Sequence, residues 1–471
     1  MTEQDKTAPG ALDETLAERV RAAMARWHIP GAAVGVLADG ARQAAGFGVT
    51  SLETGYAVRP DTLFQIGSIT KVFTTTLVML LVEEGKLALD TPIVEYLPDL
   101  KLADADAQAR ITLRMLLSHS GGFYGDFFDD FGLGDDALSA YVARLHTLAQ
   151  QTPPGESWAY NNAGFCLAGA IIERVTGMPY EKAMRERVFA PLGLAHTFFF
   201  AHEAIAYPNA VGHTQVTPGS DEHEVARLYP LPRAVNPAGG IISTVDDLLT
   251  FAQFHLAGGV TRDGQRLLSE ATTRALWQPQ IKAANFAEAY GIGWETRELD
   301  GVRLIGHGGS TNGFNARLTI VPERQFAVAI LTNSGRGSAM YEEVIADLLA
   351  ERFGLRAVKP QPISLPADAL AAFAGVYVRP DGRITFSVTG DGLRREMTFT
   401  SLLEGKTETY PPQDLRPISA TEFVVVTPGE DLDSRLDFLP GDDGRPRYLR
   451  MGGRLAAREQ ETTTSGQERQ A

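Results

Sequence analysis

A proline-rich segment near residue 360 divides the 471-residue sequence into two parts of different character. In "LRAVKPQPISLPADAL", three prolines fall within about seven residues, which is typical of an extended linker. Helical and strand patterns alternate before this segment. After it, short alternating segments are broken by Asp-Gly turns, which favours antiparallel strands. We therefore expect two domains, a large first one and a small all-β second one.

The pattern predicts five divisions of the chain. We expect a flexible N-terminus over residues 1–11, a first domain over 12–356 and a linker over 357–368. An all-β domain should follow over residues 369–457. The final residues, 458–471, are polar and without periodicity, which predicts a disordered tail.

Composition excludes several kinds of protein. The net charge of -15 argues against nucleic acid or an anionic membrane as the main partner. A single cysteine, Cys166, rules out an internal disulfide, and its place in the apolar run "FCLAGAII" predicts a buried side chain. There is no His-Glu-x-x-His, and the nine histidines lack ligand spacing, so we expect neither a metal nor a cofactor.

The N-terminal residues suggest a cytoplasmic protein. The start "MTEQDKTAPGALDETLAERV" shows no basic segment followed by an apolar one, and the apolar stretches elsewhere are too short to span a bilayer. A chain already trimmed of a leader would begin in the same way.

Periodicity before the linker predicts a mixed α and β domain. We expect a helix over residues 12–27, a strand in "PGAAVGVLADG", and a helix that opens at Ser68. "ARITLRMLLSHSGG" indicates one further helix, and "EEVIADLLAERFG" a closing helix. "HGGSTNGFNARLTIVPERQFAVAILTNS" alternates like successive antiparallel strands.

The helix that opens at Ser68 carries a lysine three residues later. Positions i and i+3 share a helix face, so the Lys71 amine can reach the Ser68 hydroxyl. A serine at a helix start is stabilised as an alkoxide by the macrodipole, and the apolar turns "VFTTTLVMLL" would bury the pair. In the alternative interpretation, Ser68 is only an N-cap and Lys71 a surface residue.

Two later segments carry polar residues that suit acyl transfer. In "PPGESWAYNNAGF", Tyr160 can pass protons and Asn162 can hold a substrate carbonyl, although Asn161 or Asn162 could simply cap the next helix. In "LIGHGGSTNGF", His307 is followed by two glycines that leave space for a ligand backbone, although a strand-end turn would look alike.

Taken in order, Ser-x-x-Lys, Tyr-x-Asn and His-Gly-Gly resemble the serine β-lactamase and penicillin-binding-protein superfamily. The tyrosine in the second element points to the branch of class C β-lactamases, DD-carboxypeptidases and esterases. The phrases "LLSHSGG" and "NPAGGIISTVDDLLTFAQFHLAGG" are also similar to that branch. The resemblance covers about residues 12 to 355, and it implies an α+β fold, with an antiparallel sheet flanked by helices and an all-helical subdomain.

The resemblance also implies a role for each candidate residue. Ser68 is the expected nucleophile, Lys71 and Tyr160 the pair that handles protons, and Asn162 a substrate-positioning residue. Which of Lys71 and Tyr160 takes the first proton is left open. The backbone N–H groups of Ser68 and Ser310 would form the oxyanion hole.

The third element departs from the β-lactamase pattern. His307 stands where β-lactamases carry a lysine, while Gly308 and Gly309 would let substrate pair with the strand edge. A neutral histidine supplies no fixed charge for a substrate carboxylate, which weakens the case for penicillins. The aromatic and acidic stretch "GGFYGDFFDDFGLGDDAL", including Phe123, would border the cleft and favour apolar or amine-bearing substrates, unless it is only a solvated loop.

The C-terminal domain resembles the lipocalin-like barrels attached to some members of the superfamily. In "YLRMGGRLAAR", Arg450 and Arg454 are either exposed strand charges or, for Arg450, a cation that reaches the substrate. The sequence predicts a serine hydrolase of esters, or of amides and peptides that contain D-amino acids, with a small-molecule or peptide acyl donor. The alternatives are a thioesterase or cyclase that releases nonribosomal peptides, a class C-like β-lactamase, and a non-catalytic binding scaffold.

Overall fold

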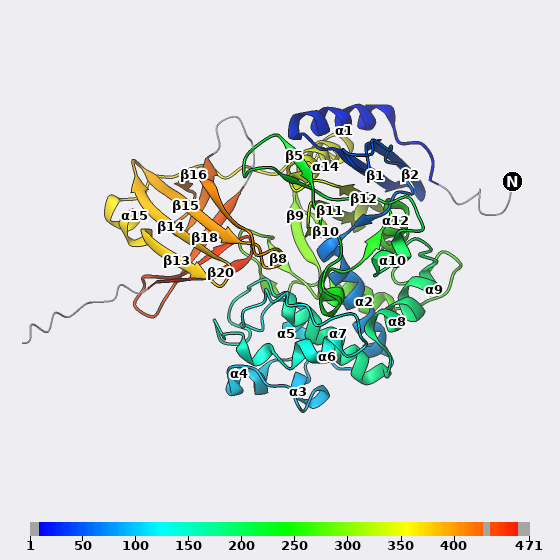
Figure 1. The fold of residues 1–471 in the computed structure, drawn as a ribbon, viewed down its shortest axis with the longest axis horizontal. Coiled ribbons are helices and arrows are strands. Elements are labelled where there is room, and N and C mark those ends of the chain that lie inside the picture. The colour runs from blue at the N-terminus through cyan, green and yellow to red at the C-terminus, as the bar shows by residue number, and fades with distance from the viewer. Residues whose placement is uncertain (1–8, 427–433, 460–471) are drawn as a thin grey trace, which may run out of the picture. The chain divides into compact units, whose positions relative to one another are not determined.

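The computed structural model describes residues 9–426 and 434–459. The chain divides into two compact units, Met1–Val358 and Lys359–Ala471. Most of the predicted flexible N-terminus and nearly all of the predicted tail lie outside the described residues. Figure 1 shows an α and β unit and a β-barrel unit.

The centre of the first unit is an antiparallel sheet of eight strands. It was expected from the alternating segments, and the register places the chain ends of the unit next to each other, since β1 pairs with both β2 and β12. In spatial order the strands are β2 (Ala41–Gly48), β1 (Gly31–Ala38), β12 (Phe326–Thr332), β11 (Phe314–Val321), β10 (Val302–Thr311), β9 (Glu295–Leu299), β8 (Ala289–Tyr290) and β7 (Ile281–Lys282). Two small ladders pair β3 (Phe64–Gln65) with β6 (Ile242–Ser243), and β4 (His213–Gln215) with β5 (His223–Val225).

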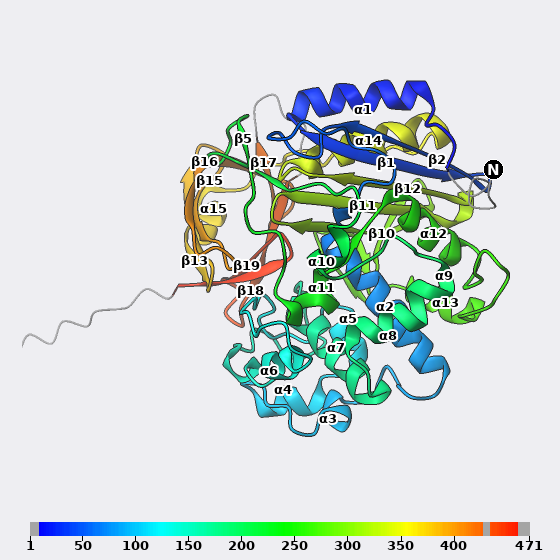
Figure 2. The same cartoon turned by 45° about the vertical axis from the view of Figure 1, so that its right-hand side comes forward.

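Helices cover both faces of this sheet. On one face, α1 (Glu14–Trp27) and α14 (Gly337–Phe353) lie side by side and bury an apolar cluster against β1 and β12 (Figure 1). Asp13 caps α1, because its side chain accepts a hydrogen bond from Leu16 N. On the other face, α2 (Thr70–Glu83) and α12 (Val245–Leu256) pack on the sheet. The helices from α3 (Ile93–Tyr96) to α7 (Asn162–Thr176) lie beyond α2 (Figure 2).

The helical elements of the first unit are numbered in chain order. They are α1 (Glu14–Trp27), η2 (Gly67–Ile69), α2 (Thr70–Glu83), α3 (Ile93–Tyr96), α4 (Ala105–Arg110), α5 (Leu113–Leu117), α6 (Ala137–Val142), η3 (Leu145–Thr147), α7 (Asn162–Thr176), α8 (Tyr180–Met184), η4 (Arg185–Phe189), α9 (Ala190–Leu192), α10 (Ala201–Ala204), η5 (Arg233–Val235), α11 (Asn236–Gly239), α12 (Val245–Leu256), α13 (Glu270–Leu276), η6 (Pro322–Arg324) and α14 (Gly337–Phe353).

The prediction of a single helix in "ARITLRMLLSHSGG" is wrong. The structure has two short helices, because Ile111 is extended, with a φ of -65° and a ψ of 125°. Thr112 is also extended, and its hydroxyl caps α5 by accepting from Met115 N at 3.3 Å. Two consecutive β-branched residues, the second a good cap, explain the break.

The second unit is a closed antiparallel barrel of eight strands, as the alternating segments predicted. An apolar cluster fills it, with the tilted rings of Phe373 and Phe438 at a centroid distance of 4.7 Å. Its elements are α15 (Ala367–Phe373), β13 (Gly375–Arg379), β14 (Gly382–Thr389), β15 (Gly392–Thr400), β16 (Thr407–Pro417), β17 (Glu422–Val426), β18 (Arg435–Pro440), β19 (Pro446–Met451) and β20 (Arg454–Arg458). Among the helices of the described residues, none is long and apolar enough to cross a membrane.

Candidate active site

Ser68 lies at the entrance to α2, the central helix of the first unit. It occupies η2, which leads directly into α2, and its side chain is only partly buried. The N–H groups at this helix start give the hydroxyl a positive local potential. The helix itself is buried all round, since every residue from Thr70 to Leu81 is buried.

Lys71 faces Ser68 from the first turn of α2. Its ammonium nitrogen Nζ lies 3.0 Å from Ser68 Oγ, 2.7 Å from Asn162 Oδ1 and 2.7 Å from the carbonyl oxygen of Ala238. The side chain has no solvent exposure, so it is not the surface lysine of the alternative interpretation. The oxygens of Asn162 and Ala238 can only accept, so in a neutral amine they take both N–H groups and leave the lone pair toward Ser68.

The turn before α7 brings the next two residues to the same place. Asn161 is the cap of α7, because its Oδ1 accepts from Gly164 N at 2.7 Å, and this leaves Asn162 to face the site. Asn162 accepts from Lys71 and donates from Nδ2 to Asp126 Oδ1 at 2.6 Å. The ring centroid of Tyr160 lies 4.8 Å from Lys71 Nζ.

The end of β10 lies against η2. A Cβ on Gly309 would overlap the carbonyl oxygen of Ile66 and lie 3.1 Å from Ser68 N. A Cβ on Gly67, whose φ is +51°, would lie 2.7 Å from Ser310 N. Only glycines permit this approach, which brings the backbone N–H groups of Ser68 and Ser310 into one region. That placement suits an oxyanion hole.

His307 is buried in β10 and held by two hydrogen bonds. Its Nε2 lies 2.7 Å from the hydroxyl of Tyr290, and its Nδ1 lies 2.5 Å from the carbonyl oxygen of Gly308. Burial lowers the pKa of His307 to about 4, against the attraction of Glu295. The imidazole is therefore neutral at pH 7, which agrees with the expectation drawn from the sequence.

A buried ion pair lies beside His307. Glu295 Oε2 accepts from Arg317 at 2.5 Å, and Oε1 accepts from Gly308 N at 3.1 Å. Burial alone would raise the pKa of Glu295, but Arg317, followed by His307, lowers it to about 2. The carboxylate thus fixes the backbone of Gly308, and the positive charge of Arg317 is neutralised within the protein.

Two residues predicted to contact substrate have other surroundings. The Phe123 side chain is buried in the main apolar core, while its carbonyl oxygen accepts from Asn161 Nδ2 at 2.8 Å. Arg450 is buried and has an acidic partner, so it is not the exposed strand charge of the first interpretation. It donates to both oxygens of Asp437, at 3.0 and 2.7 Å, inside the barrel unit. A substrate role for either side chain stays a prediction.

Sequence reasoning missed three residues that support the site. Asp126 holds Asn162, and the buried Tyr290 joins His307 to His119. His119 stands in "LLSHSGG", and a histidine inside an otherwise small and polar break was a usable signal. Nothing in the sequence could bring Tyr290 to His119, because the two are 171 residues apart.

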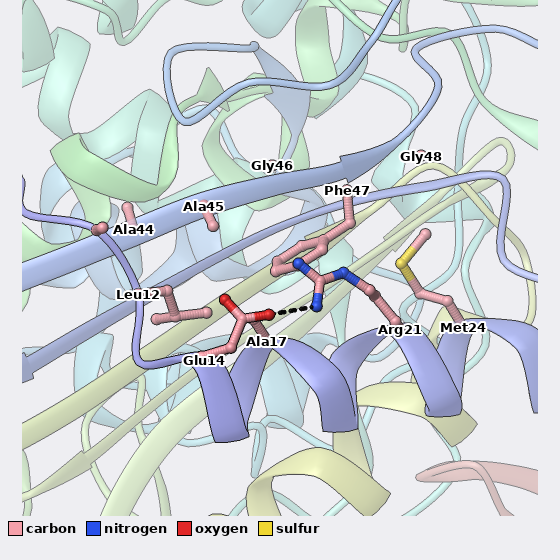
Figure 3. Close-up of a pocket in the computed structure, with 11 residues that line it drawn as sticks. Leu12, Glu14, Ala17, Arg21, Met24, Ala44, Ala45, Gly46, Phe47 and Gly48 are labelled. Atoms are coloured by element: carbon pink, nitrogen blue, oxygen red, sulfur yellow. Dashed lines mark hydrogen bonds and ion pairs between the residues drawn. The ribbon is translucent and has the colours of Figure 1, made fainter.

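A cavity of about 540 Å³ lies elsewhere, between α1 and β2 (Figure 3). Arg21 crosses it, with an ion pair to Glu14 at 2.8 Å and its guanidinium 5.7 Å from the centre of the Phe47 ring. None of the residues that line it belongs to the cluster around Ser68, so this cavity is not the candidate active site.

Comparison with protein families identifies the class. The family model described as Beta-lactamase matches residues 16–351, which is well over half of the chain. The chain therefore belongs to the beta-lactamase family of serine hydrolases and penicillin-binding proteins, as its motifs suggested.

Known proteins match with different coverage. "Penicillin-binding protein 4" from Amycolatopsis lactamdurans is 36% identical over 78% of this chain and 97% of its own length. An unguisins hydrolase from Aspergillus campestris is 29% identical over 69% of this chain and 62% of its own length. The crystal structure of SurE superposes with a TM-score of 0.75 at 27% identity, over 95% of this chain and 99% of SurE. SurE has also been solved with D-Leu.

Proposed function

We propose that this protein is a serine acyl-transfer hydrolase that forms an acyl-enzyme on Ser68. Its expected substrates are esters, or amides and peptides that contain D-amino acids. The observation that carries the proposal is the environment of Lys71, a fully buried amine 3.0 Å from Ser68 Oγ.

The contacts of the site support a complete acyl-transfer cycle. Ser68 loses its proton to Lys71 or Tyr160 as Oγ attacks the acyl carbon, and the oxyanion develops between the N–H groups of Ser68 and Ser310. The same pair returns the proton to the leaving group. Water then attacks the acyl-enzyme. The same pair takes a proton from the water and gives a proton to Ser68 Oγ, which releases the acid and restores Ser68.

The charges around the site favour particular acyl donors. His307 is neutral at pH 7, because burial lowers its pKa to about 4, and Arg317 is occupied by Glu295. A donor with a free carboxylate next to the scissile bond would therefore meet no free guanidinium from Arg317. The Asp126 carboxylate is one hydrogen bond from Asn162. Neutral or amine-bearing donors suit this distribution better than penicillins do.

The known relatives support a hydrolase, and one solved complex supports a donor that contains a D-amino acid. A relative in the comparison is a hydrolase of unguisins, and SurE, which matches both units of this chain, has been solved with D-Leu. The match to SurE extends beyond the hydrolase unit. The peptide-releasing thioesterase or cyclase, which the sequence offered as an alternative, is kept as the second candidate.

A substrate panel tests the proposal on the full-length protein. The panel contains p-nitrophenyl esters, D- and L-amino-acid amides, a peptidyl thioester and nitrocefin, and each rate is repeated with Ser68→Ala. We expect Ser68-dependent turnover of short esters and D-amides, with L-amides and nitrocefin far slower. A cyclic product from the thioester would favour the second candidate. Nitrocefin turnover equal to that of the ester would overturn the proposed ranking.

A further inference from the structure

We propose that His119 and Tyr290 are positioning residues that couple the turn carrying Tyr160 to the strand carrying His307. The coupling is a chain of hydrogen bonds that runs in one direction through the buried interior. The inference rests on the proposed acyl-transfer function, since it assigns these residues a role in the same site.

The first links of the chain fix the tautomer of His119. The N–H of Asn161 donates to His119 Nδ1 at 3.0 Å, so this nitrogen carries a lone pair. The proton of the neutral ring is therefore on Nε2, which lies 3.2 Å from the hydroxyl of Tyr290 and donates to its oxygen.

The remaining links fix the tautomer of His307. Its Nδ1 faces the carbonyl oxygen of Gly308, which can only accept, so Nδ1 carries the proton. In the neutral ring, Nε2 is then the acceptor for the Tyr290 hydroxyl at 2.7 Å. The carbonyl of Gly293 also lies near that hydroxyl, but at 3.5 Å it is the poorer acceptor.

His119 also braces the Tyr160 turn directly. Its carbonyl oxygen accepts from Ala159 N, and its ring lies against that of Tyr160, with 4.3 Å between the ring centroids. The residue has a φ of 57°, in the left-handed region that non-glycine residues seldom adopt, and it is fully buried. A buried histidine in this conformation must be held by its surroundings, and such residues gather at functional sites.

The chain therefore joins two walls of the site. One end is the turn that presents Tyr160 and Asn162, and the other is the end of β10 that leads to Ser310. Loss of the hydrogen bond from Tyr290 to His119 or to His307 should let the turn and the strand shift relative to each other. A small displacement of the reacting groups lowers the reaction rate strongly.

Three variants of the full-length enzyme separate this role from general packing. His119→Asn keeps an acceptor and suits a left-handed backbone, but its amide is too short to reach the hydroxyl of Tyr290. Tyr290→Phe removes only the hydroxyl, and the third variant combines both changes. Tyr377→Phe is the matched control, because Tyr377 is a buried tyrosine whose hydroxyl donates to Phe373 O in the barrel unit.

We expect each single variant to lower kcat for the best ester about tenfold with KM nearly unchanged. The kcat of the double variant should be no lower than that of the more impaired single variant, because both changes break the same chain of hydrogen bonds. The control should match the wild type. Losses that multiply in the double variant, or single variants with wild-type kcat, would overturn the inference.

Nitrogen NMR of the histidines in the full-length protein gives a readout that does not depend on activity. His307→Gln assigns the His307 signals. We expect a protonated Nδ1 and a hydrogen-bonded Nε2 acceptor, with the Nε2 signal shifted in Tyr290→Phe and unmoved in Tyr377→Phe. An Nε2 signal that does not respond to Tyr290→Phe contradicts the chain. If the wild type shows no Ser68-dependent turnover, the proposed function fails, and the signals still decide whether the chain exists.

Discussion

The two units bury a cation in different ways. In the hydrolase unit, Lys71 contacts the hydroxyl of Ser68 and the neutral oxygens of Asn162 and Ala238. In the barrel unit, Arg450 makes two hydrogen bonds to the carboxylate of Asp437. The arrangement in the barrel keeps Arg450 charged, because a neutral side chain there would leave the buried carboxylate of Asp437 without the opposite charge of Arg450. The first arrangement permits the charge to change, since neutral oxygens accept from an amine as well as from an ammonium.

Removing the amine of Lys71 should have the largest effect. Lys71→Met keeps an unbranched side chain one atom shorter than that of lysine, but it leaves no group that can take the Ser68 proton where Nζ lay 3.0 Å away. We expect kcat/KM for the best ester to fall on the order of 10³-fold or more. Stopped-flow and steady-state kinetics measure this loss, and circular dichroism checks folding. A folded Lys71→Met with activity within tenfold of wild type would contradict the assigned role.

Removing the cation of the barrel should act on stability. Arg450→Met removes the guanidinium that makes two hydrogen bonds to the buried carboxylate of Asp437, which should lower the free energy of unfolding of that unit by about 3 kcal/mol. The double variant Arg450→Met/Asp437→Leu should recover most of the loss. Denaturant titration of the three proteins measures both values. If Arg450→Met is instead stable but changes the preference among long acyl donors, Arg450 acts on substrate as the sequence first suggested.

Acid should destabilise the hydrolase unit through His307. Burial lowers the pKa of this histidine from 6.5 to about 4. Between these pH values the unfolded chain binds a proton that the folded chain does not. The contribution of His307 to the free energy of unfolding is therefore complete above pH 6.5, and it decreases by about 1.4 kcal/mol for each pH unit as the pH is lowered toward 4. The barrel has no histidine in its sequence, Lys359–Ala471, and should lack this slope.

His307→Gln isolates this contribution. The free energy of unfolding of both proteins is measured between pH 7 and pH 4.5, and the difference between them should shrink steadily toward acid pH. The raised pKa of Glu173, to about 7 through burial, acts with the opposite sign but is present in both proteins. A difference that does not vary with pH would show that His307 titrates normally.

Removing the barrel should have the smallest effect on a small substrate. The residues assigned to chemistry all precede Val358, where the first unit ends. We expect a chain that ends at Val358 to fold and to hydrolyse the smallest ester within about threefold of the full-length rate. Its preference between long and short acyl donors should change more. Unchanged relative rates across a donor series would make the barrel a structural appendage.

Local patterns in the sequence predicted what is local in the structure. The helix α1, the helix that opens at Ser68 and the strands of the barrel follow from periodicity and turn residues. The spacing of Ser68 and Lys71 also predicted that these two proposed reacting groups share one helix face. Two β-branched residues, Ile111 and Thr112, interrupt a helical pattern. The sequence predicted one helix there, whereas the structure has α4 and α5 separated by these two residues.

The support around the site could not be predicted in the same way. Glu295 on β9 and Arg317 on β11 form their ion pair across β10, which lies between these two strands. Tyr290 and His119 meet only because β8 lies at the Tyr160 turn. Such contacts depend on the register of the sheet, which periodicity does not encode. The resemblance to known motifs indicated the residues that we propose to react, but not the groups that hold them.

Direct detection of the acyl-enzyme tests the central claim most closely. The full-length protein is treated with a fluorophosphonate and, separately, with its best ester at low pH, and intact mass and peptide mapping locate the adduct. The account predicts one adduct per chain, on Ser68, which is absent from Ser68→Ala and strongly slowed in Lys71→Met. An adduct on another residue, or ester turnover that survives in Ser68→Ala, would contradict it.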